Sequence, residues 1–227
     1  MGNDYKYEFL LHLVRTGAIK FKESGHYSIN IADAMRTGAD AIRVANAYAI
    51  HIKELGIKFD YIHGAAYKGI PLAILVAIQL SELKINKRWG YSRKEKKQHG
   101  EEGVIVGKLQ DNDTVLIVDD TITTGVESWL KLPVHKSIKP VGILIAVDCE
   151  ESSDKKILEK YQLKLYSILR ITEVLELLHE IEKALTNIEL AEDIEELKEA
   201  INSLTRVLIE KIKENGWDNC PYLAPHR

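Results

Sequence analysis

The segment Val115-Leu-Ile-Val-Asp-Asp-Thr-Ile-Thr-Thr-Gly125 carries the strongest structural signal in this sequence. Its first four residues form an uninterrupted apolar run, which is typical of a parallel strand buried on both faces. Two carboxylates, Asp119 and Asp120, end the run. Small hydroxyl-bearing residues follow, and free backbone N–H groups at the start of a helix can surround a phosphate there. The stretch therefore predicts a strand, an acidic pair and an anion-binding turn, which together suit a ribose 5-phosphate.

The acidic pair also has a simpler interpretation, in which Asp119 and Asp120 only cap a helix that follows a core strand. Two adjacent carboxylates at the mouth of a buried sheet repel each other, however, unless a polyhydroxy ligand or a metal complex shares their charge. We therefore favour the ligand-binding interpretation.

Composition limits the class of partner. The chain has 227 residues, 45% of them hydrophobic, which is enough for one substantial core or a core with an appendage. Its net charge of −3 creates no global field for nucleic acid or an anionic membrane, so we expect a small-molecule partner. Cys149 and Cys220 lack metal-binding spacing, and the most apolar stretch, 70–80, is too short to span a bilayer. We expect a soluble cytoplasmic protein that binds neither nucleic acid nor membrane.

Strands alternate with helices along most of the chain. The patterns predict helices at 5–15, 33–56, from 70 onward, 125–132, 153–161 and 171–185. They predict strands at 59–63, 104–106, 115–118, 141–147 and 163–168, and those at 115–118 and 141–147 are expected to be buried. Short strands at 18–21 and 27–31 look like a hairpin-like flap. The alternation implies an α/β fold with a doubly wound parallel sheet. On helix 33–56, one face is expected to carry Ile42, Ala45, Ala49 and Ile52. From residue 190 onward, a helical apolar seam predicts packing on the core or on a partner.

Two further segments are expected to come directly after strands, and ligands of such folds bind at the carboxyl ends of the strands. The turn 64–69 contains small residues and Lys68, without a Walker pattern. The polar segment 92–103 lacks hydrophobic periodicity, and its simpler interpretation is a solvated charged tip. The alternative is a hinged lid whose cations close over a pyrophosphate. Its cations and glycines are Arg93, Lys94, Lys96, Lys97, His99, Gly100 and Gly103.

Three motifs carry a family resemblance. Arg93-Lys-Glu-Lys-Lys-Gln-His-Gly100 resembles the Arg-Lys-Glu-x-Lys-x-His-Gly loop of orotate phosphoribosyltransferases. Gly64-Ala-Ala-Tyr-Lys-Gly-Ile-Pro71 is similar to that family's Gly-Pro-Ala-Tyr-Lys-Gly-Ile-Pro segment. The central stretch resembles the phosphoribosyl pyrophosphate (PRPP) signature of type I phosphoribosyltransferases. The resemblance implies that fold, with a phosphoribosyltransferase domain at 1–185, hood strands within 17–31, a flexible lid at 92–103 and an added helical extension at 186–227.

The resemblance also implies a reaction. This is the Mg²⁺-dependent transfer of ribose 5-phosphate from PRPP to orotate, giving orotidine 5′-monophosphate and pyrophosphate in de novo pyrimidine (UMP) biosynthesis. A homodimer with the lid shared across the interface is expected, with Mg²⁺ carried by PRPP rather than bound directly by the protein. The alternatives are a phosphoribosyltransferase for another base and a catalytically silent PRPP-sensing regulator.

Carried over position by position, the resemblance assigns three sets of residues. The expected catalytic residues are Lys94, Lys97, His99, Asp119 and Asp120. The expected PRPP-binding residues are Tyr67, Lys68, Arg93, Lys94, Lys97, His99, Asp119, Asp120, Thr121, Ile122, Thr123, Thr124 and Gly125. The expected base-binding residues are Lys22, Ser28, Ile29, Thr123 and Cys149.

Three positions depart from the family pattern. Cys149 stands where the family usually has an Arg that grips the orotate carboxylate. The hood segment reads Lys22-Glu-Ser-Gly25 in place of Lys-Ser-Gly, and Ala65 replaces the customary Pro. Loss of a bidentate carboxylate clamp would cost about 2–3 kcal/mol of orotate binding unless Lys22, His26 or a C-terminal group substitutes.

Overall fold

The computed structural model describes residues 4–21, 27–92, 105–121, 137–150, 158–159 and 163–176. The chain divides into two compact units. One unit spans Phe9–Arg170 and contains both sheets of the described chain, and the other combines the first eight residues with those from Ile171 on. The helix α1 (Asp4–Arg15) crosses from one unit to the other, close to its predicted position.

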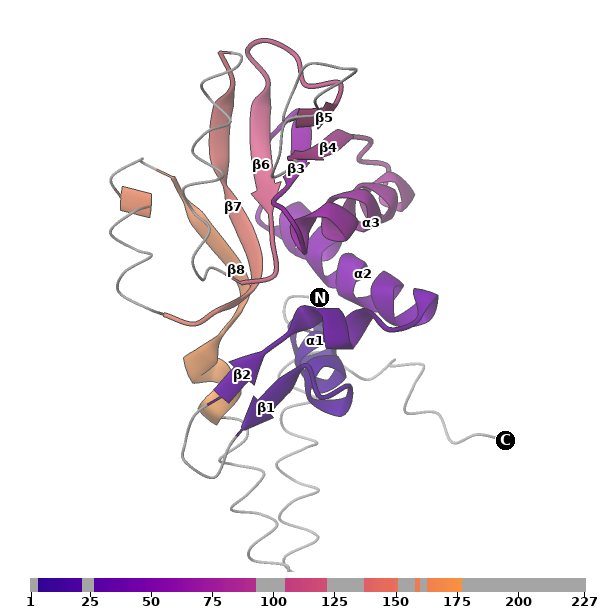
Figure 1. Ribbon diagram of the computed structural model, residues 1–227, viewed down its shortest axis with the longest axis vertical. Helices are drawn as coiled ribbons and strands as arrows, with labels where there is room; N and C mark the ends of the chain where they lie inside the picture. The colour runs from indigo at the N-terminus through magenta and orange to yellow at the C-terminus, as the bar shows by residue number, and fades with distance from the viewer. Residues whose placement is uncertain are drawn as a thin grey trace, which may run out of the picture. The chain divides into compact units, whose positions relative to one another are not determined.

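A six-stranded sheet forms the centre of the larger unit, in the order β5-β4-β3-β6-β7-β8 (Figure 1). Its strands are β3 (Tyr61–Gly64), β4 (Arg88–Ser92), β5 (Ile105–Gly107), β6 (Thr114–Val118), β7 (Lys139–Asp148) and β8 (Leu165–Arg170). All neighbours pair in parallel except β4 and β5, which are antiparallel. The predicted α/β fold with a parallel sheet is therefore confirmed, with the difference that the edge strand β5 is antiparallel.

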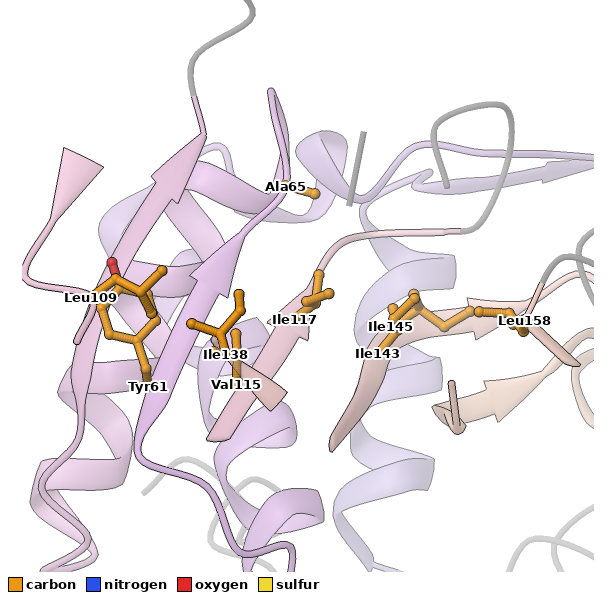
Figure 2. Packing of buried hydrophobic residues seen from close by; sticks show 9 residues of the cluster. All are labelled: Tyr61, Ala65, Leu109, Val115, Ile117, Ile138, Ile143, Ile145 and Leu158. Atoms are coloured by element: carbon orange, nitrogen blue, oxygen red, sulfur yellow. The ribbon is translucent and has the colours of Figure 1, made fainter. Parts of the chain in front are cut away.

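The core of the sheet follows from the apolar runs of its strands. Val115, Leu116, Ile117 and Val118 of β6 are all fully buried. Alternate residues of a strand point to opposite faces, and one face carries the cluster of Val115, Ile117 and Ile143 with side chains of neighbouring strands (Figure 2). The helices α2 (Gly38–Glu54) and α3 (Gly69–Glu82) pack on the sheet and on each other. Burial on both faces explains why β6 has no polar alternation.

The helix predicted at 33–56 is wrong at its start. A 3₁₀ helix occupies Ile31–Met35, and α2 begins separately at Gly38 and ends at Glu54. Thr37 separates the two because its backbone is extended, and its hydroxyl oxygen accepts a hydrogen bond from the Asp40 N–H (3.2 Å). A threonine in this conformation caps the helix that follows it.

The buried face of α2 also differs from the prediction at one residue. Ala45, Ala49 and Ile52 are buried as expected, but Ile42 is 51% exposed. The buried stripe instead continues through Val44 and Tyr48. These residues belong to adjacent i, i+4 rows, which form one face of a helix.

The remaining short elements agree with the sequence patterns. The strands β1 (Ile19–Phe21) and β2 (Tyr27–Ile29) form a separate antiparallel pair, as predicted for the flap. The helix α3 (Gly69–Glu82) has Pro71 in its first turn, where the missing N–H of proline costs no hydrogen bond. No described helix is both long and apolar enough to cross a membrane.

Tyr61 fills a notch between two glycines at the β4–β5 edge. A Cβ atom on Gly90 or on Gly107 would overlap the Tyr61 hydroxyl group. The same atoms would also meet backbone carbonyls, that of Val106 from position 90 and that of Trp89 from position 107. Glycine at both positions therefore allows β4 and β5 to approach each other around the tyrosine.

Several predicted elements lie outside the described residues. They include the helices predicted at 125–132 and from 190 onward, and most of the helix predicted at 153–161. The helix predicted at 171–185 is described only over 171–176, which are helical. The domain boundary at 185 and the extension at 186–227 stay predictions.

Candidate active site

Two of the predicted site segments meet at the carboxyl edge of the sheet. The strands β3 and β6 are parallel neighbours, with Gly64 opposite Val118. The turn 64–69 continues from β3, and the acidic pair follows β6 directly. The Ala65 N–H donates to the carbonyl of Val118 (3.2 Å). The fold thus brings together segments that are more than fifty residues apart in the chain.

Hydrogen bonds to β7 fix the backbone of the acidic pair. The Asp119 N–H donates to the carbonyl of Leu144 (3.1 Å), and the carbonyl of Asp120 accepts from the Ala146 N–H (2.9 Å). Within the pair, the Asp120 N–H donates to Asp119 Oδ1 (3.0 Å). The pair therefore prolongs the β6–β7 ladder, which holds both carboxylates at the edge of the sheet.

Burial makes the Asp119 carboxylate costly to ionise. Burial first, and then the negative charge of Asp120, raise the pKa of Asp119 from 3.8 to about 7. The positive charge of Lys68 and the backbone N–H of Asp120 oppose this rise in pKa. The result is a carboxyl group that changes charge near neutral pH, which is common at sites that bind or transform ligands.

Lys68 joins the two segments by an ion pair. Its Nζ donates to Asp120 Oδ2 at 2.6 Å. The Asp120 side chain is 8% exposed, whereas that of Lys68 is 47% exposed. A nearly buried carboxylate needs a counter-charge, and the half-exposed lysine supplies it. Both residues were predicted from the sequence, but their direct contact was not.

Two glycines allow the turn 64–69 to lie against β6. A Cβ atom on Gly69 would overlap the carbonyl oxygen of Val118, and one on Gly64 would overlap the carbonyl of Gly69. Backbone atoms cannot move aside as a flexible side chain can. The close approach of Lys68 to Asp120 therefore depends on glycine at both positions.

Gly69→Ala is expected to destabilise the protein by about 1–3 kcal/mol, because the added methyl group pushes the turn away from Val118. The same displacement moves Lys68 away from Asp120, which weakens their ion pair. Chemical denaturation would measure the loss of stability. Gly38→Ala is the matched control, since a Cβ there meets nothing within 4 Å. Equal stabilities of the two variants would contradict the expectation.

The other described site residues take varied positions. Tyr67 is 63% exposed on the turn, and Thr121 is buried directly after the acidic pair. In the predicted base-binding set, Ser28 is exposed on β2, Ile29 is half-buried beside it, and Cys149 is half-buried after β7. The location of a residue does not by itself establish its role, so the roles of these residues in binding remain predictions. The site residues outside the described chain are Lys22, Arg93, Lys94, Lys97, His99, Ile122, Thr123, Thr124 and Gly125.

Two residues at this edge were not predicted. Tyr48 of α2 donates its hydroxyl hydrogen to the backbone carbonyl of Asp119 (2.7 Å). His63 of β3 lies 2.9 Å from the Ser92 hydroxyl through Nε2, and burial lowers the pKa of His63 to about 4. Helical spacing marks Tyr48 as buried, and a buried tyrosine hydroxyl usually has a partner. Neither signal identifies that partner.

The donor atoms here do not form a complete metal cage. In the part of the chain that the structure describes, no group of three or more His, Cys, Asp or Glu side chains could hold a metal ion. The acidic pair offers two carboxylates, and one of them already contacts Lys68. Such a donor set fits a divalent ion that uses few protein ligands and keeps water or substrate phosphates as its other ligands.

Comparisons with known proteins agree on one family. The chain is 36% identical over 191 residues to an orotate phosphoribosyltransferase of Marinobacter nauticus, covering 78% of this chain and 89% of that protein. It is 37% identical over 194 residues to one from Clostridium acetobutylicum, covering 77% and 86%. The crystal structure of the Francisella tularensis enzyme matches with a TM-score of 0.64 and 25% identity, covering 87% of this chain and 94% of that one. No family model matches the chain.

A mostly parallel six-stranded sheet with an acidic pair and a glycine-flanked turn at its carboxyl edge defines a type I phosphoribosyltransferase. The sequence identities to the two relatives, and the share of each chain they cover, place the protein in one family of this class. The chain belongs to the orotate phosphoribosyltransferase family.

Proposed function

We propose that this chain transfers ribose 5-phosphate from PRPP to N1 of orotate at the carboxyl edge of its sheet. The observation that carries the proposal is the contact between Lys68 and Asp120, which joins the turn 64–69 to the acidic pair. Membership of a family of pentosyltransferases supplies the reaction. The residue roles below are inferred from the geometry of the described site and from the family resemblance.

Asp119 and Asp120 are proposed to hold the ribose hydroxyl groups. Ionised carboxylates accept hydrogen bonds strongly, and the backbone of both residues is fixed by hydrogen bonds to β7. In the ligand-free protein, Lys68 balances the charge of Asp120. When PRPP binds, its hydroxyl groups can replace Lys68 at this carboxylate, while the pyrophosphate offers the lysine another anionic partner. The ion pair thus keeps the site charged and ordered before the substrate arrives.

In the reaction, the bond from ribose C1 to the pyrophosphate oxygen breaks and the bond from C1 to N1 of orotate forms, while the N1 proton leaves to the pyrophosphate or to water. Positive charge develops on the sugar and negative charge gathers on the leaving pyrophosphate. Carboxylates beside the sugar and cations beside the pyrophosphate stabilise that distribution more than they stabilise the ground state. Lys68 is the cation proposed for this role within the described residues. The sequence predicts the same role for Arg93, Lys94, Lys97 and His99.

Mg²⁺ is proposed to enter with PRPP, where it would neutralise charge on the pyrophosphate. The two carboxylates of the acidic pair fit an ion that needs few protein ligands. Thr121, with Ile122, Thr123, Thr124 and Gly125 beyond it, is proposed to bind the 5′-phosphate. A homodimer that shares the segment 92–103 between its sites remains part of the proposal.

Incubation with PRPP, Mg²⁺ and orotate tests the function, with orotate absorbance as the readout. Loss of orotate absorbance that requires all three components would support the proposal. Turnover of another base without turnover of orotate would reassign the substrate within the type I class. Other bases are included because Cys149 stands where the family usually has an Arg that binds the orotate carboxylate. PRPP binding without turnover of any base would instead indicate a sensor of PRPP.

PRPP affinity is expected to rise as the pH rises through about 7, because the ionised form of Asp119 is the better acceptor and its pKa is about 7. The stability of the ligand-free protein should change in the opposite direction. The pKa of Asp119 is higher in the folded protein than in the unfolded chain, so the protonated carboxyl group favours the folded state. This contribution to stability is complete below about pH 4 and is lost as the pH rises through 7. Between roughly pH 5.5 and 8.5, calorimetry would follow the PRPP affinity and thermal unfolding would follow the stability.

Asp119→Asn is the control for this pH dependence. Titration of the PRPP phosphates affects both proteins equally, so the difference between them isolates the Asp119 carboxyl group. The affinity of wild type relative to the variant should increase with pH. A constant ratio across the range would show that Asp119 does not titrate there.

A further inference from the structure

Tyr48 reaches the acidic pair from outside the sheet. It lies in the middle of α2, is fully buried, and precedes Asp119 by 71 residues in the chain. Its hydroxyl group donates to the backbone carbonyl of Asp119 at 2.7 Å. Its ring meets Phe9 edge to face, with 6.5 Å between the ring centroids. The aromatic body is therefore packed in the core while the hydroxyl group points at the site.

We propose that Tyr48 is a positioning residue of the transferase site, which acts by fixing the direction of the Asp119 carboxylate. This inference rests on the proposed function. The Asp119 N–H is already held by Leu144 on β7. The hydrogen bond from Tyr48 holds the carbonyl of the same residue, so both backbone polar groups of Asp119 are fixed. With its peptide groups fixed, Asp119 has only side-chain torsions left to vary.

Packing alone does not account for a tyrosine here. A phenylalanine would fill the same core space, and a buried hydroxyl group without a partner would be unfavourable. Within the described residues, the hydrogen bonds between the acidic pair and β7 join backbone atoms to backbone atoms. Tyr48 and Lys68 instead approach the pair with side chains from α2 and from the turn 64–69. Lys68 sets the charge at Asp120, and Tyr48 sets the backbone at Asp119.

The Tyr48 hydroxyl group remains a donor throughout the working pH range. Burial first, and then the negative charges of Asp120 and Asp119, raise the pKa of Tyr48 well above its ordinary value of 10. The backbone N–H of Ala146 opposes this rise only in part. A neutral phenol can donate to a carbonyl next to two carboxylates without adding a third negative charge. That property suits a support for an acidic site.

The test replaces Tyr48 by Phe, which removes the donor and keeps the ring. We expect the KM for PRPP to rise about tenfold, as follows from loss of one hydrogen bond to a buried carbonyl. The KM for orotate at saturating PRPP should stay unchanged, because the effect passes through the sugar site. Tyr48→p-aminophenylalanine, which restores an N–H donor, should recover PRPP affinity. This second variant keeps the test valid if Tyr48→Phe folds poorly.

Tyr61→Phe is the matched control. Tyr61 is also fully buried, and its hydroxyl group donates to the backbone carbonyl of Val106 (3.4 Å), away from the acidic pair. Both phenylalanine variants should lose thermal stability, but only Tyr48→Phe should alter the KM for PRPP. Equal PRPP kinetics in the two variants would overturn the inference and leave Tyr48 a structural residue.

A double-mutant cycle gives an independent readout. If Tyr48 acts through Asp119, Tyr48→Phe should cause little further loss of PRPP affinity in a chain that already carries Asp119→Asn. Fully additive losses would overturn the inference. Absence of PRPP binding and turnover in the wild-type protein would instead refute the proposed function, so the two failures are distinguishable.

Discussion

Asp120→Asn is expected to lower kcat/KM for PRPP by about 10²–10³-fold, the scale observed when one preorganised electrostatic contact to a transition state is removed. The substitution preserves the size of the side chain but removes its charge. Lys68 then loses its anionic partner at 2.6 Å, and the developing positive charge on the ribose loses a nearby carboxylate. Steady-state kinetics with varied PRPP would measure the change.

Asp60→Asn provides the matched control for this prediction. Asp60 accepts hydrogen bonds from the Thr114 N–H (3.0 Å) and hydroxyl (2.6 Å) at the amino end of β6. The acidic pair follows the opposite end of the same strand. Asp60→Asn should cost about 1 kcal/mol of stability or less with kcat/KM unchanged. If both variants had similar kinetics, the acidic pair would not be the site of sugar binding.

Lys97→Ala is expected to lower kcat by about 10²–10³-fold with little loss of stability. Lys97 lies outside the described residues, and the prediction comes from the resemblance of the segment 93–100 to the family loop. A cation that closes over the pyrophosphate contributes mainly as negative charge develops there, so kcat should fall more than PRPP affinity. Lys108→Ala, which changes an exposed lysine after β5, is the control. An unaltered kcat in Lys97→Ala would refute the role.

Mixing two inactive variants would test whether the segment 92–103 serves the neighbouring subunit. In a dimer that shares this segment, a chain with Lys97→Ala and a chain with Asp120→Asn can form one site with both residues intact. Equal mixing would then restore about a quarter of wild-type activity, since half of the dimers have one intact site. No recovery after confirmed subunit exchange would mean that Lys97 acts within its own chain.

Most of the sheet could be predicted from local sequence. The run 115–118 is apolar on both faces, as a buried parallel strand requires, and the strands on either side of it were predicted at 59–63 and 141–147. The strand β4 was not among the predicted strands, because Arg88, Gly90 and Ser92 interrupt any apolar run there. The direction of β5 could not be found this way, because apolar pattern does not distinguish parallel from antiparallel pairing. The break at Thr37 was also missed. It depends on the conformation of a single capping residue within an otherwise helical pattern.

The composition of the site was predictable, but its internal contacts were not. Asp119, Asp120 and Lys68 belong to recognisable motifs, and the sequence places each of them after a strand. The ion pair between Lys68 and Asp120 depends on the register of β3 and β6, which no local pattern gives. The contact of Tyr48 with Asp119 spans 71 residues and depends on how α2 packs. Such long-range contacts follow from the tertiary fold alone.

The notch that holds the Tyr61 hydroxyl group limits which side chains the β4–β5 edge of the sheet can carry. Gly90 and Gly107 each face the phenolic oxygen and a neighbouring main-chain oxygen. Tyr61→Phe would remove only the contact with the phenolic oxygen. A Cβ atom at position 90 or 107 would still overlap a main-chain oxygen, so neither glycine could be replaced after that change alone. A side chain at position 90 or 107 would therefore require Tyr61 and both strands to move together.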